Sequence, residues 1–301
     1  MTKKLIILLG PTGVGKTDLS IKIANYFHTS IVSCDSRQIY KEMKIGTAVP
    51  EEEQLQAVKH YFIQSISARE YYNSWKFEED ALETISKLHK ANDVVLMTGG
   101  SMMYIDAVCN GIDDIPTISS EIRNAVMKKY AEEGLESIQA ELLQLDPDFY
   151  NEVDLNNAKR VMHAIEICRE SGTTYSSLRT NSKKKRPFEI IKVGLKRERE
   201  ELYDRINRRV DIMLKDGLEK EARALYHLKN INSLNTVGYK ELFEYFDGNI
   251  DYKEAVRLIK RNSRRYAKHQ MTWFRKDEAI TWFNPEKEDE ILSFLKEKVD
   301  F

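Results

Sequence analysis

The first residues that could do chemistry form a phosphate-binding motif near the start of the 301-residue chain. The pattern G-x-x-x-x-G-K-[ST] is matched by Gly10, Pro11, Thr12, Gly13, Val14, Gly15, Lys16 and Thr17. Its glycines allow the loop to curl so that backbone N–H groups and the start of the next helix face phosphate oxygens. Lys16 adds a positive charge, and the Thr17 hydroxyl is a ligand for Mg²⁺. The motif predicts polyphosphate binding, as in ATP-binding proteins, and does not name the reaction; a chance match is the alternative.

A single carboxylate, Asp35, is the next candidate for chemistry. It follows the apolar run 30–33, at the carboxyl end where parallel sheets place ligands. Another apolar run, 94–97, leads into Thr98-Gly-Gly-Ser101 and lacks the acidic residue that would hold Mg²⁺ in an ordinary ATPase. Asp35 could bind Mg²⁺ through water, act as a general base, or cap a helix together with Ser36.

Strands and helices must position these residues at one edge of a sheet. Apolar runs typical of strands cover residues 5–9, 30–33, 94–97 and 190–195, and residues 279–283 could add a last strand. Helical patterns separate the runs, which is typical of a parallel sheet. The expected fold is α/β: a P-loop NTPase-like parallel sheet flanked by helices, with an inserted all-helical lobe and a helical C-terminal extension.

The interval between the runs 94–97 and 190–195 has helical patterns throughout, for example at 121–133 and 157–171. Pro116 precedes it, and the basic run Lys183–Arg186 closes it. We therefore expect residues 1–115 to form the first part of the core, 116–186 the inserted lobe, and 187–301 the rest of the core and the C-terminal helical region.

Composition places the chain among globular proteins, because 42% of its residues are hydrophobic and 32% are charged. The net charge of −1 is unevenly distributed: residues 156–275 hold 28 Lys and Arg against 16 Asp and Glu. This basic part of the chain indicates either an anionic partner or solvated helix faces.

The three cysteines, Cys34, Cys109 and Cys168, are odd in number and far apart, so neither a disulfide framework nor a zinc site is supported. The apolar run 5–9 is too short for a secretory signal, and no apolar stretch reaches the roughly eighteen residues of a membrane span. We expect a cytoplasmic enzyme with no membrane partner.

Over nearly its whole length the chain resembles the bacterial tRNA dimethylallyltransferases. After the phosphate-binding motif, the family's early motifs are matched by Ser33-x-Asp35-Ser36-x-Gln38-x-Tyr40, Gly46-Thr47-x-x-Pro50, His60 and Gly99-Gly100-Ser101-x-x-Tyr104. Its later motifs are matched by Arg205-Ile-x-x-Arg209-Val-Asp-x-Met213, Gly217-Leu-x-x-Glu221, Val237-Gly-Tyr-Lys-Glu241 and Arg265-Tyr-Ala-Lys-x-Gln-x-Thr-Trp-Phe-Arg275. The last block is the most specific, since a P-loop alone occurs in many unrelated enzymes.

Two motifs depart from the family's pattern. The family's Gly-Gly-Thr-Gly-Leu-Tyr is Gly99-Gly-Ser-Met-Met-Tyr104 here, which places Met102 where the family has a glycine and changes the demands on the local backbone. In the family's Asn-Pro-x-Arg-x-x-Arg, Ala158 replaces the proline and His163 the second arginine. The change at His163 would make an RNA contact there weaker or pH-sensitive.

The resemblance implies transfer of a dimethylallyl group from dimethylallyl diphosphate to N6 of the adenosine 3′ of the anticodon in tRNA, with release of pyrophosphate. Residues 10–17 would bind the diphosphate. Mg²⁺ would be held by Thr17, with Asp35 as a further ligand through water. Because an aromatic amine is a poor nucleophile whose proton must leave, the same resemblance assigns Asp35 as general base and Thr17 as part of the catalytic set.

Arg205 and Arg209 share one helix face by their i, i+4 spacing, and a guanidinium fork suits pyrophosphate oxygens. The resemblance implies that Arg205 binds the diphosphate and that Arg209 acts in catalysis. The alternative is a pair of exposed arginines that form ion pairs with Asp204 or Asp211.

The resemblance also implies contacts to an RNA partner, the tRNA anticodon stem-loop. These contacts map onto Asp35, Ser36, Arg37, Gln38, Ser101, Arg123, Lys159, Arg160, Val161, Met162 and His163. An enzyme that alkylates a ring amine must flip the base out of its stack, which is easier in a single-stranded loop. We expect the protein to act as a monomer.

Other protein classes stay open at this stage. One alternative is a P-loop kinase for a small molecule, with the arginine helix as its lid. Two features argue against it: the run 94–97 does not end in a second carboxylate, and such a kinase would not need the C-terminal third of the chain. An RNA-binding module with a nucleotide-sensing P-loop would have no use for Asp35 at the strand end. Prenylation of free adenine nucleotides is the nearest alternative, and the inserted lobe and basic linker favour RNA over it.

Overall fold

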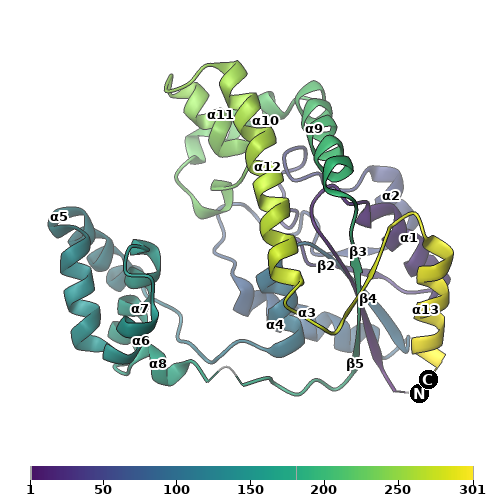
Figure 1. The fold of residues 1–301 in the computed structure, drawn as a ribbon, viewed down its shortest axis with the longest axis horizontal. Helices are drawn as coiled ribbons and strands as arrows, with labels where there is room; N and C mark the ends of the chain where they lie inside the picture. Colours follow the sequence, from purple (N-terminus) through teal and green to yellow (C-terminus); the bar gives the residue numbers. More distant parts are fainter. Residues whose placement is uncertain (1, 181, 301) are drawn as a thin grey trace. The chain divides into compact units, whose positions relative to one another are not determined.

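The computed structural model describes residues 2–180 and 182–300 and has an α/β fold (Figure 1). Its strands form one sheet with the order β3-β2-β4-β1-β5-β6, in which all paired neighbours are parallel. The strands are β1 (Lys4–Leu9), β2 (Ile31–Ser33), β3 (His60–Tyr61), β4 (Val94–Gly99), β5 (Glu189–Leu195) and β6 (Ile280–Phe283). A parallel sheet flanked by helices was expected from the sequence, and this fold class is confirmed.

The central strand β1 is buried along its whole length. Leu5, Ile7 and Leu9 belong to one hydrophobic core, while Ile6 and Leu8 belong to a second. The alternation follows from strand geometry, since successive side chains point to opposite faces of the sheet. Because both faces are apolar, helices must cover both.

Most helices of the sheet-containing unit contribute to one or both of these cores. They are α1 (Lys16–Tyr26), α2 (Glu52–Ala57), α3 (Ser74–Leu88), α4 (Met102–Asn110), α9 (Arg199–Lys215), α10 (Leu218–Leu225), α11 (Tyr239–Phe246), α12 (Tyr252–Phe274) and α13 (Glu288–Asp300). Helices α3, α4, α10 and α11 supply the first core, and α1 and α13 the second. Helices α9 and α12 contribute residues to both cores, which places them at the edge of the sheet where its strands end.

The chain forms two compact units, Met1–Cys109 with Arg186–Phe301, and Asn110–Lys185. The second unit is helical and consists of α5 (Ser120–Leu145), α6 (Pro147–Glu152), α7 (Ala158–Ser171) and α8 (Tyr175–Leu178). It has its own core, which includes Ile138, Leu142 and Ile165. From the sequence we placed the inserted lobe at residues 116–186.

Within the described residues, no helix is long and apolar enough to cross a membrane.

Two elements differ from the sequence expectation. Strand β3 was not predicted, because two residues are too short to show a period; it pairs with β2 through Ile31 and Val32. The helix expected at 121–133 continues to Leu145 across a kink at Gly134, whose φ of 81° interrupts the helical backbone. Two short 3₁₀ turns, Tyr226–Leu228 and Asn232–Leu234, link α10 to α11.

Candidate active site

The phosphate-binding loop, residues 10–17, joins the central strand β1 to α1. Gly13 has a φ of 80° and Gly15 a φ of 108°, in the left-handed region that favours glycine. A Cβ on Gly13 would lie 2.9 Å from Ile206 Cγ1 of α9. The loop is therefore curled around the start of α1, with α9 packed directly against it.

The Lys16 side chain folds back over this loop. Its Nζ donates hydrogen bonds to the carbonyl oxygens of Gly10 and Pro11, each at 2.9 Å. Burial lowers the pKa of Lys16 to about 8, Arg209 acts in the same direction, and Asp35 opposes the shift. An anionic ligand would stabilise the charged form of this poorly solvated lysine and so raise its pKa.

Helix α9 brings both predicted arginines to the loop. Arg205 Nε donates to the Gly13 carbonyl at 3.0 Å. Arg209 lies deeper, where burial lowers its pKa and the Asp35 carboxylate opposes that shift.

The alternative of exposed arginine pairs is not supported for these two residues. Asp204 instead pairs with Arg208 at 2.5 Å, and Asp211 pairs with Lys260 at 2.5 Å. One further arginine at the loop was not predicted: Arg197 Nε donates to the Val14 carbonyl at 3.0 Å. Because this contact joins a residue near the end of β5 to the loop after β1, no local pattern could have revealed it.

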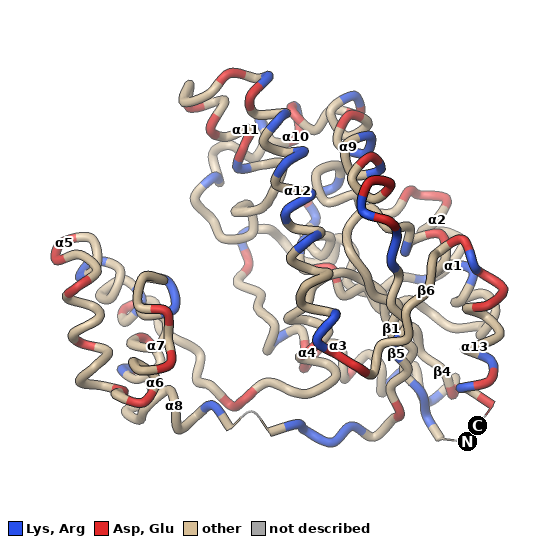
Figure 2. The backbone as a smooth tube through the Cα atoms, in the orientation of Figure 1, with Lys and Arg blue, Asp and Glu red and all other residues tan. Residues whose placement is uncertain are grey.

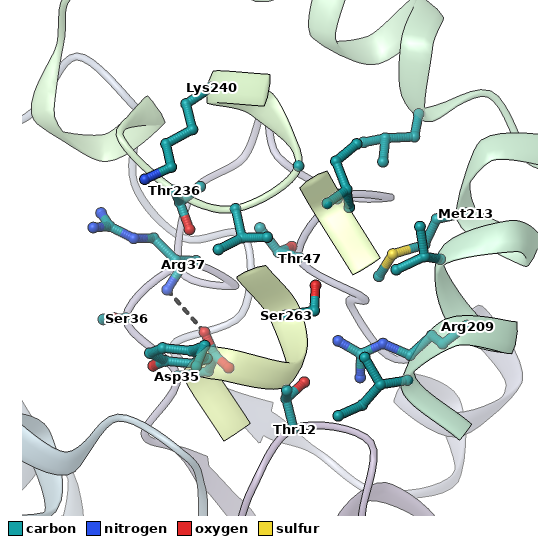
Figure 3. Close-up of a pocket in the computed structure, with 18 of the residues that line it drawn as sticks. Thr12, Asp35, Ser36, Arg37, Thr47, Arg209, Met213, Thr236, Lys240 and Ser263 are labelled. Atoms are coloured by element: carbon teal, nitrogen blue, oxygen red, sulfur yellow. Dashed lines mark hydrogen bonds between the residues drawn. The ribbon is translucent and has the colours of Figure 1, made fainter. Parts of the chain in front are cut away.

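Asp35 follows β2 and faces a cavity together with Thr12 and Arg209 (Figure 3). Its Oδ1 accepts hydrogen bonds from the backbone N–H groups of Arg37 at 2.9 Å and Gln38 at 3.3 Å. One alternative was that Asp35 caps a helix together with Ser36. The carboxylate does accept backbone N–H groups, but the segment that it caps is a turn and not a helix. Its Oδ2 has no hydrogen-bond partner among the described residues, so one carboxylate oxygen is available to a ligand.

Ser101 lies beside Asp35 and is nearly buried. Its Oγ accepts from the Ser36 N–H at 2.8 Å and donates to Ser36 Oγ at 2.9 Å. Tyr266 of α12 also reaches this network: burial raises the pKa of its hydroxyl to about 12, Asp35 adds to the shift, and a hydrogen bond to Ser101 reduces it. Sequence reasoning missed Tyr266, although it stands inside the most specific motif block.

Two adjoining cavities meet at these residues. One has a volume of about 270 Å³ and the other, over the phosphate-binding loop, about 810 Å³. They share Thr12, Asp35, Thr47, Arg209, Met213 and Tyr266. The smaller cavity has an apolar wall made of Ile206, Val210, Met213, Leu218, Val237 and Ile259. A cavity lined by Lys16, Arg205 and Arg209 therefore opens into a partly apolar one, with Asp35 at the junction.

The loop 44–48 forms part of the wall between the cavities. Glu221 of α10 accepts the backbone N–H groups of Lys44 at 3.0 Å, Ile45 at 2.8 Å and Gly46 at 2.9 Å. The same carboxylate accepts from the Tyr239 hydroxyl at 2.6 Å. The loop, Glu221 and Tyr239 belong to three motif blocks that are far apart in the sequence, and these hydrogen bonds bring the blocks together in one site.

The remaining predicted contacts near the cavity take different roles. The Gln38 side chain donates to the carbonyls of Thr47 at 3.1 Å and Ala48 at 2.8 Å, so it holds the same loop. Arg37 and Lys240 both line the smaller cavity (Figure 3).

Residues of the helical unit lie on other elements. Arg123 is on α5, and Lys159, Arg160 and His163 are exposed on α7. Met162 is partly buried. Val161 is fully buried in the core of this unit, so its side chain packs inside and is not available to RNA.

The residues Met102, Ala158 and His163, which depart from the family pattern, fit their surroundings. Met102 begins α4 and packs into the first core. Ala158 begins α7, whose N-cap is Asn157. His163 Nδ1 is 3.8 Å from the Glu166 carboxylate.

The donor atoms for a metal at the phosphate loop are few. Thr17 and Asp35 both line the larger cavity. Within the described residues, no group of three or more His, Cys, Asp or Glu is arranged to hold a metal ion. Mg²⁺ commonly binds through one or two protein oxygens, substrate phosphates and several waters, so Thr17 with Asp35 is a donor set that fits it.

Comparison with known proteins agrees with this geometry. The family model described as IPP transferase matches residues 38–277. The chain is 56% identical over 292 residues to tRNA dimethylallyltransferase 1 of Bacteroides thetaiotaomicron, covering 97% of this chain and 95% of the relative. It is 47% identical over 301 residues to tRNA dimethylallyltransferase of Christiangramia forsetii, covering all of both chains.

Solved structures show the same likeness. A full-length tRNA isopentenylpyrophosphate transferase from Bacillus halodurans has a TM-score of 0.73 and 33% identity, covering 99% of this chain and 97% of that one. A eukaryotic dimethylallyltransferase acting on tRNA has a TM-score of 0.76 and 25% identity, covering 91% of this chain and 70% of that one. The chain therefore belongs to the IPP transferase family, the tRNA dimethylallyltransferases.

Proposed function

We propose that this protein transfers a dimethylallyl group from dimethylallyl diphosphate to N6 of the adenosine 3′ of the anticodon in tRNA and releases pyrophosphate. The observation that carries the proposal is the position of Asp35 at the junction of the two cavities, beside Thr12 and Arg209. A donor with its diphosphate in the loop would extend its apolar group toward the apolar wall. The adenine amine would then have to enter beside Asp35.

In this reaction the C–O bond between the allylic carbon and the diphosphate breaks, and a bond forms from N6 to that carbon. Negative charge grows on the leaving pyrophosphate in the transition state. Lys16 and Arg205, which contact the loop, and the backbone N–H groups at the start of α1 would stabilise that charge, together with Arg209, which lines the same cavity from α9. Such groups, fixed before the reaction, lower the barrier because they need not reorganise.

Mg²⁺ would be held by the Thr17 hydroxyl and by diphosphate oxygens, with Asp35 as a further ligand through water. When bound, it would neutralise part of the charge on the leaving group. Asp35 would take the N6 proton through Oδ2, the oxygen that the local turn does not use. Proton transfer to a positioned carboxylate typically contributes about 10² to 10⁴ in rate.

The RNA partner would be the anticodon stem-loop, with the target base flipped into the cavity between Asp35 and Tyr266. Figure 2 shows Lys and Arg gathered along α12, where the sequence from Tyr252 to Phe274 includes seven of them and one glutamate. With Lys159 and Arg160 of α7, these cations would supply a salt-dependent attraction to phosphates. We further propose that the enzyme works in the cytoplasm, as a monomer.

Transfer of radiolabel from dimethylallyl diphosphate to an unmodified anticodon stem-loop tests this proposal. The assay needs Mg²⁺ and a parallel reaction with γ-labelled ATP. We expect Mg²⁺-dependent label in RNA and no consumption of ATP. Unlabelled RNA together with ATP hydrolysis or phosphate transfer would assign the phosphate loop to a kinase or NTPase.

A further inference from the structure

One buried amide on α12 joins the two halves of the candidate site. Gln270 is only 2% exposed. Its Oε1 accepts the Thr12 N–H of the phosphate loop at 2.9 Å, and its Nε2 donates to the Gly100 carbonyl after β4 at 2.8 Å. The two partners demand opposite roles, a donor and an acceptor, and a glutamine amide supplies both.

The neighbouring backbone is shaped around this side chain. A Cβ on Gly100 would lie 2.4 Å from Gln270 Nε2, so any other residue there would push the amide away. The Thr12 N–H is engaged by Gln270 and, in this arrangement, is not free to bind a phosphate oxygen. The role of Thr12 toward a substrate is thereby left to its side chain, which lines both cavities.

The contacts continue from Gly100 to the carboxylate. Ser101, the next residue, is hydrogen-bonded to Ser36 through both the backbone N–H and the hydroxyl of Ser36. Ser36 directly follows Asp35. A path of short contacts therefore runs from the phosphate loop through Gln270 to the Asp35 turn.

We propose that Gln270 is a positioning residue that sets the distance between the phosphate loop and Asp35, and with it the alignment of the allylic carbon with the adenine amine. This inference rests on the proposed prenyl transfer. Gln270 lines the larger cavity together with Lys16, Thr17 and Arg205, but both polar atoms of its amide are engaged by Thr12 and Gly100 and are not free to bind a diphosphate. Loss of the amide should therefore harm turnover far more than binding of pyrophosphate.

Two substitutions test the proposal. Gln270→Ala removes both contacts, and a misplacement of reacting groups by about 1 Å can cost roughly 100-fold, so we expect kcat to fall about 10- to 100-fold. The Kd for pyrophosphate with Mg²⁺, measured by titration calorimetry, should stay within about threefold of wild type.

Gln270→Glu keeps the shape of the side chain but places a carboxylate oxygen against the Gly100 carbonyl. Burial should raise the pKa of the introduced carboxyl, while Lys16, Arg205 and Arg209, which line the same cavity, would oppose that shift. Its protonated form could donate to Gly100 as the amide does. The kcat of this variant, divided by that of wild type at the same pH, should therefore rise as pH falls from about 8.5 to 6.

The control is Thr272→Ala, an exposed position two residues along the same helix. It should leave kcat, Kd and the pH profile unchanged. The proposal is overturned if Gln270→Ala turns over within twofold of wild type, if its pyrophosphate Kd weakens in parallel with kcat, or if the Gln270→Glu ratio is flat with pH. Should wild type itself transfer no prenyl group, the proposed function would fail instead.

Discussion

At the scale of single residues, the charged groups of the site shift one another's pKa. Lys16 and Arg209 are both cations whose pKa is lowered by burial, and Asp35 opposes the shift in each. One carboxylate thus faces two poorly solvated cations across the cavity. Such a site is suited to an anionic ligand, which would bind the two cations in place of water. The Asp35 carboxylate would then be free to accept a proton.

The first prediction concerns the proton acceptor. Asp35→Asn keeps an oxygen that can accept from the Arg37 and Gln38 N–H groups, so the turn should persist. The neutral amide cannot take the N6 proton, and kcat should fall by about 10² to 10⁴ while donor and RNA affinities stay close to wild type. Steady-state kinetics with the stem-loop measure this; a variant within twofold of wild type removes Asp35 from the chemistry.

The second prediction concerns pH. Lys16 has a pKa of about 8 in the free protein, so it is charged below that pH and loses its charge above it. Bound pyrophosphate favours the charged form, and its affinity should therefore weaken as pH rises through 8. Calorimetry at pH 8.5 in buffers of different ionisation enthalpy should show proton uptake on binding. Lys16→Arg should abolish the uptake; binding without proton uptake in wild type would refute the lysine assignment.

At the scale of elements, helices α9, α10 and α12 complete a site that begins on the sheet. The phosphate loop and Asp35 could be predicted from the sequence because each is a contiguous segment directly after an apolar strand. The face of α9 was partly predictable, since Arg205 and Arg209 stand one turn apart. These local signals cover the part of the site that lies on β1, β2 and α9.

Other parts of the site could not be derived from local sequence. Glu221 holds a loop that lies about 175 residues earlier in the chain, and Gln270 bonds a residue 258 positions away. Tyr266 reads simply as one of many aromatic residues on an amphipathic helix until its contact with Ser101 is seen. Such contacts depend on how the helices pack, which spacing along one helix does not determine.

The third prediction concerns the loop 44–48. Glu221→Gln places an amide NH₂ where backbone N–H groups and the Tyr239 hydroxyl donate, so at least one hydrogen bond to a charged acceptor is lost, at about 1.5 to 3 kcal/mol. Urea unfolding should show a stability loss of that order, and kcat/KM should fall because the loop bounds both cavities. Glu219→Gln, on the same helix, breaks only a surface pair with Arg223 and should change stability by less than about 1 kcal/mol. Equal effects of the two substitutions would show that Glu221 does not hold the loop.

At the scale of the whole molecule, the residues proposed for diphosphate chemistry and two of the cations proposed for RNA binding belong to different units. The phosphate loop, Asp35 and α12 belong to one unit, while Lys159 and Arg160 belong to the helical unit Asn110–Lys185. This division predicts that changes in the helical unit affect RNA binding alone.

The fourth prediction uses that division. Lys159→Ala combined with Arg160→Ala should raise KM for the stem-loop and reduce the slope of log affinity against log salt by about 1 to 2, since each phosphate contact contributes about 0.7 to 0.9. Pyrophosphate affinity should not change. Lys128→Ala, an exposed lysine of α5 in the same unit, serves as control. A double variant whose salt dependence matches the control would move the RNA surface elsewhere.

The most direct test of prenyl transfer to N6 is nucleoside mass spectrometry of an anticodon stem-loop after reaction with dimethylallyl diphosphate. Two substrates are compared: one with adenosine 3′ of the anticodon, and one with purine riboside, which lacks the exocyclic amine, at that position. Our account predicts that only the first gains one C₅H₈ unit, on the base of that nucleoside, and that Asp35→Asn strongly slows this gain. A C₅H₈ unit on the amine-free substrate, or at another nucleoside, would contradict it.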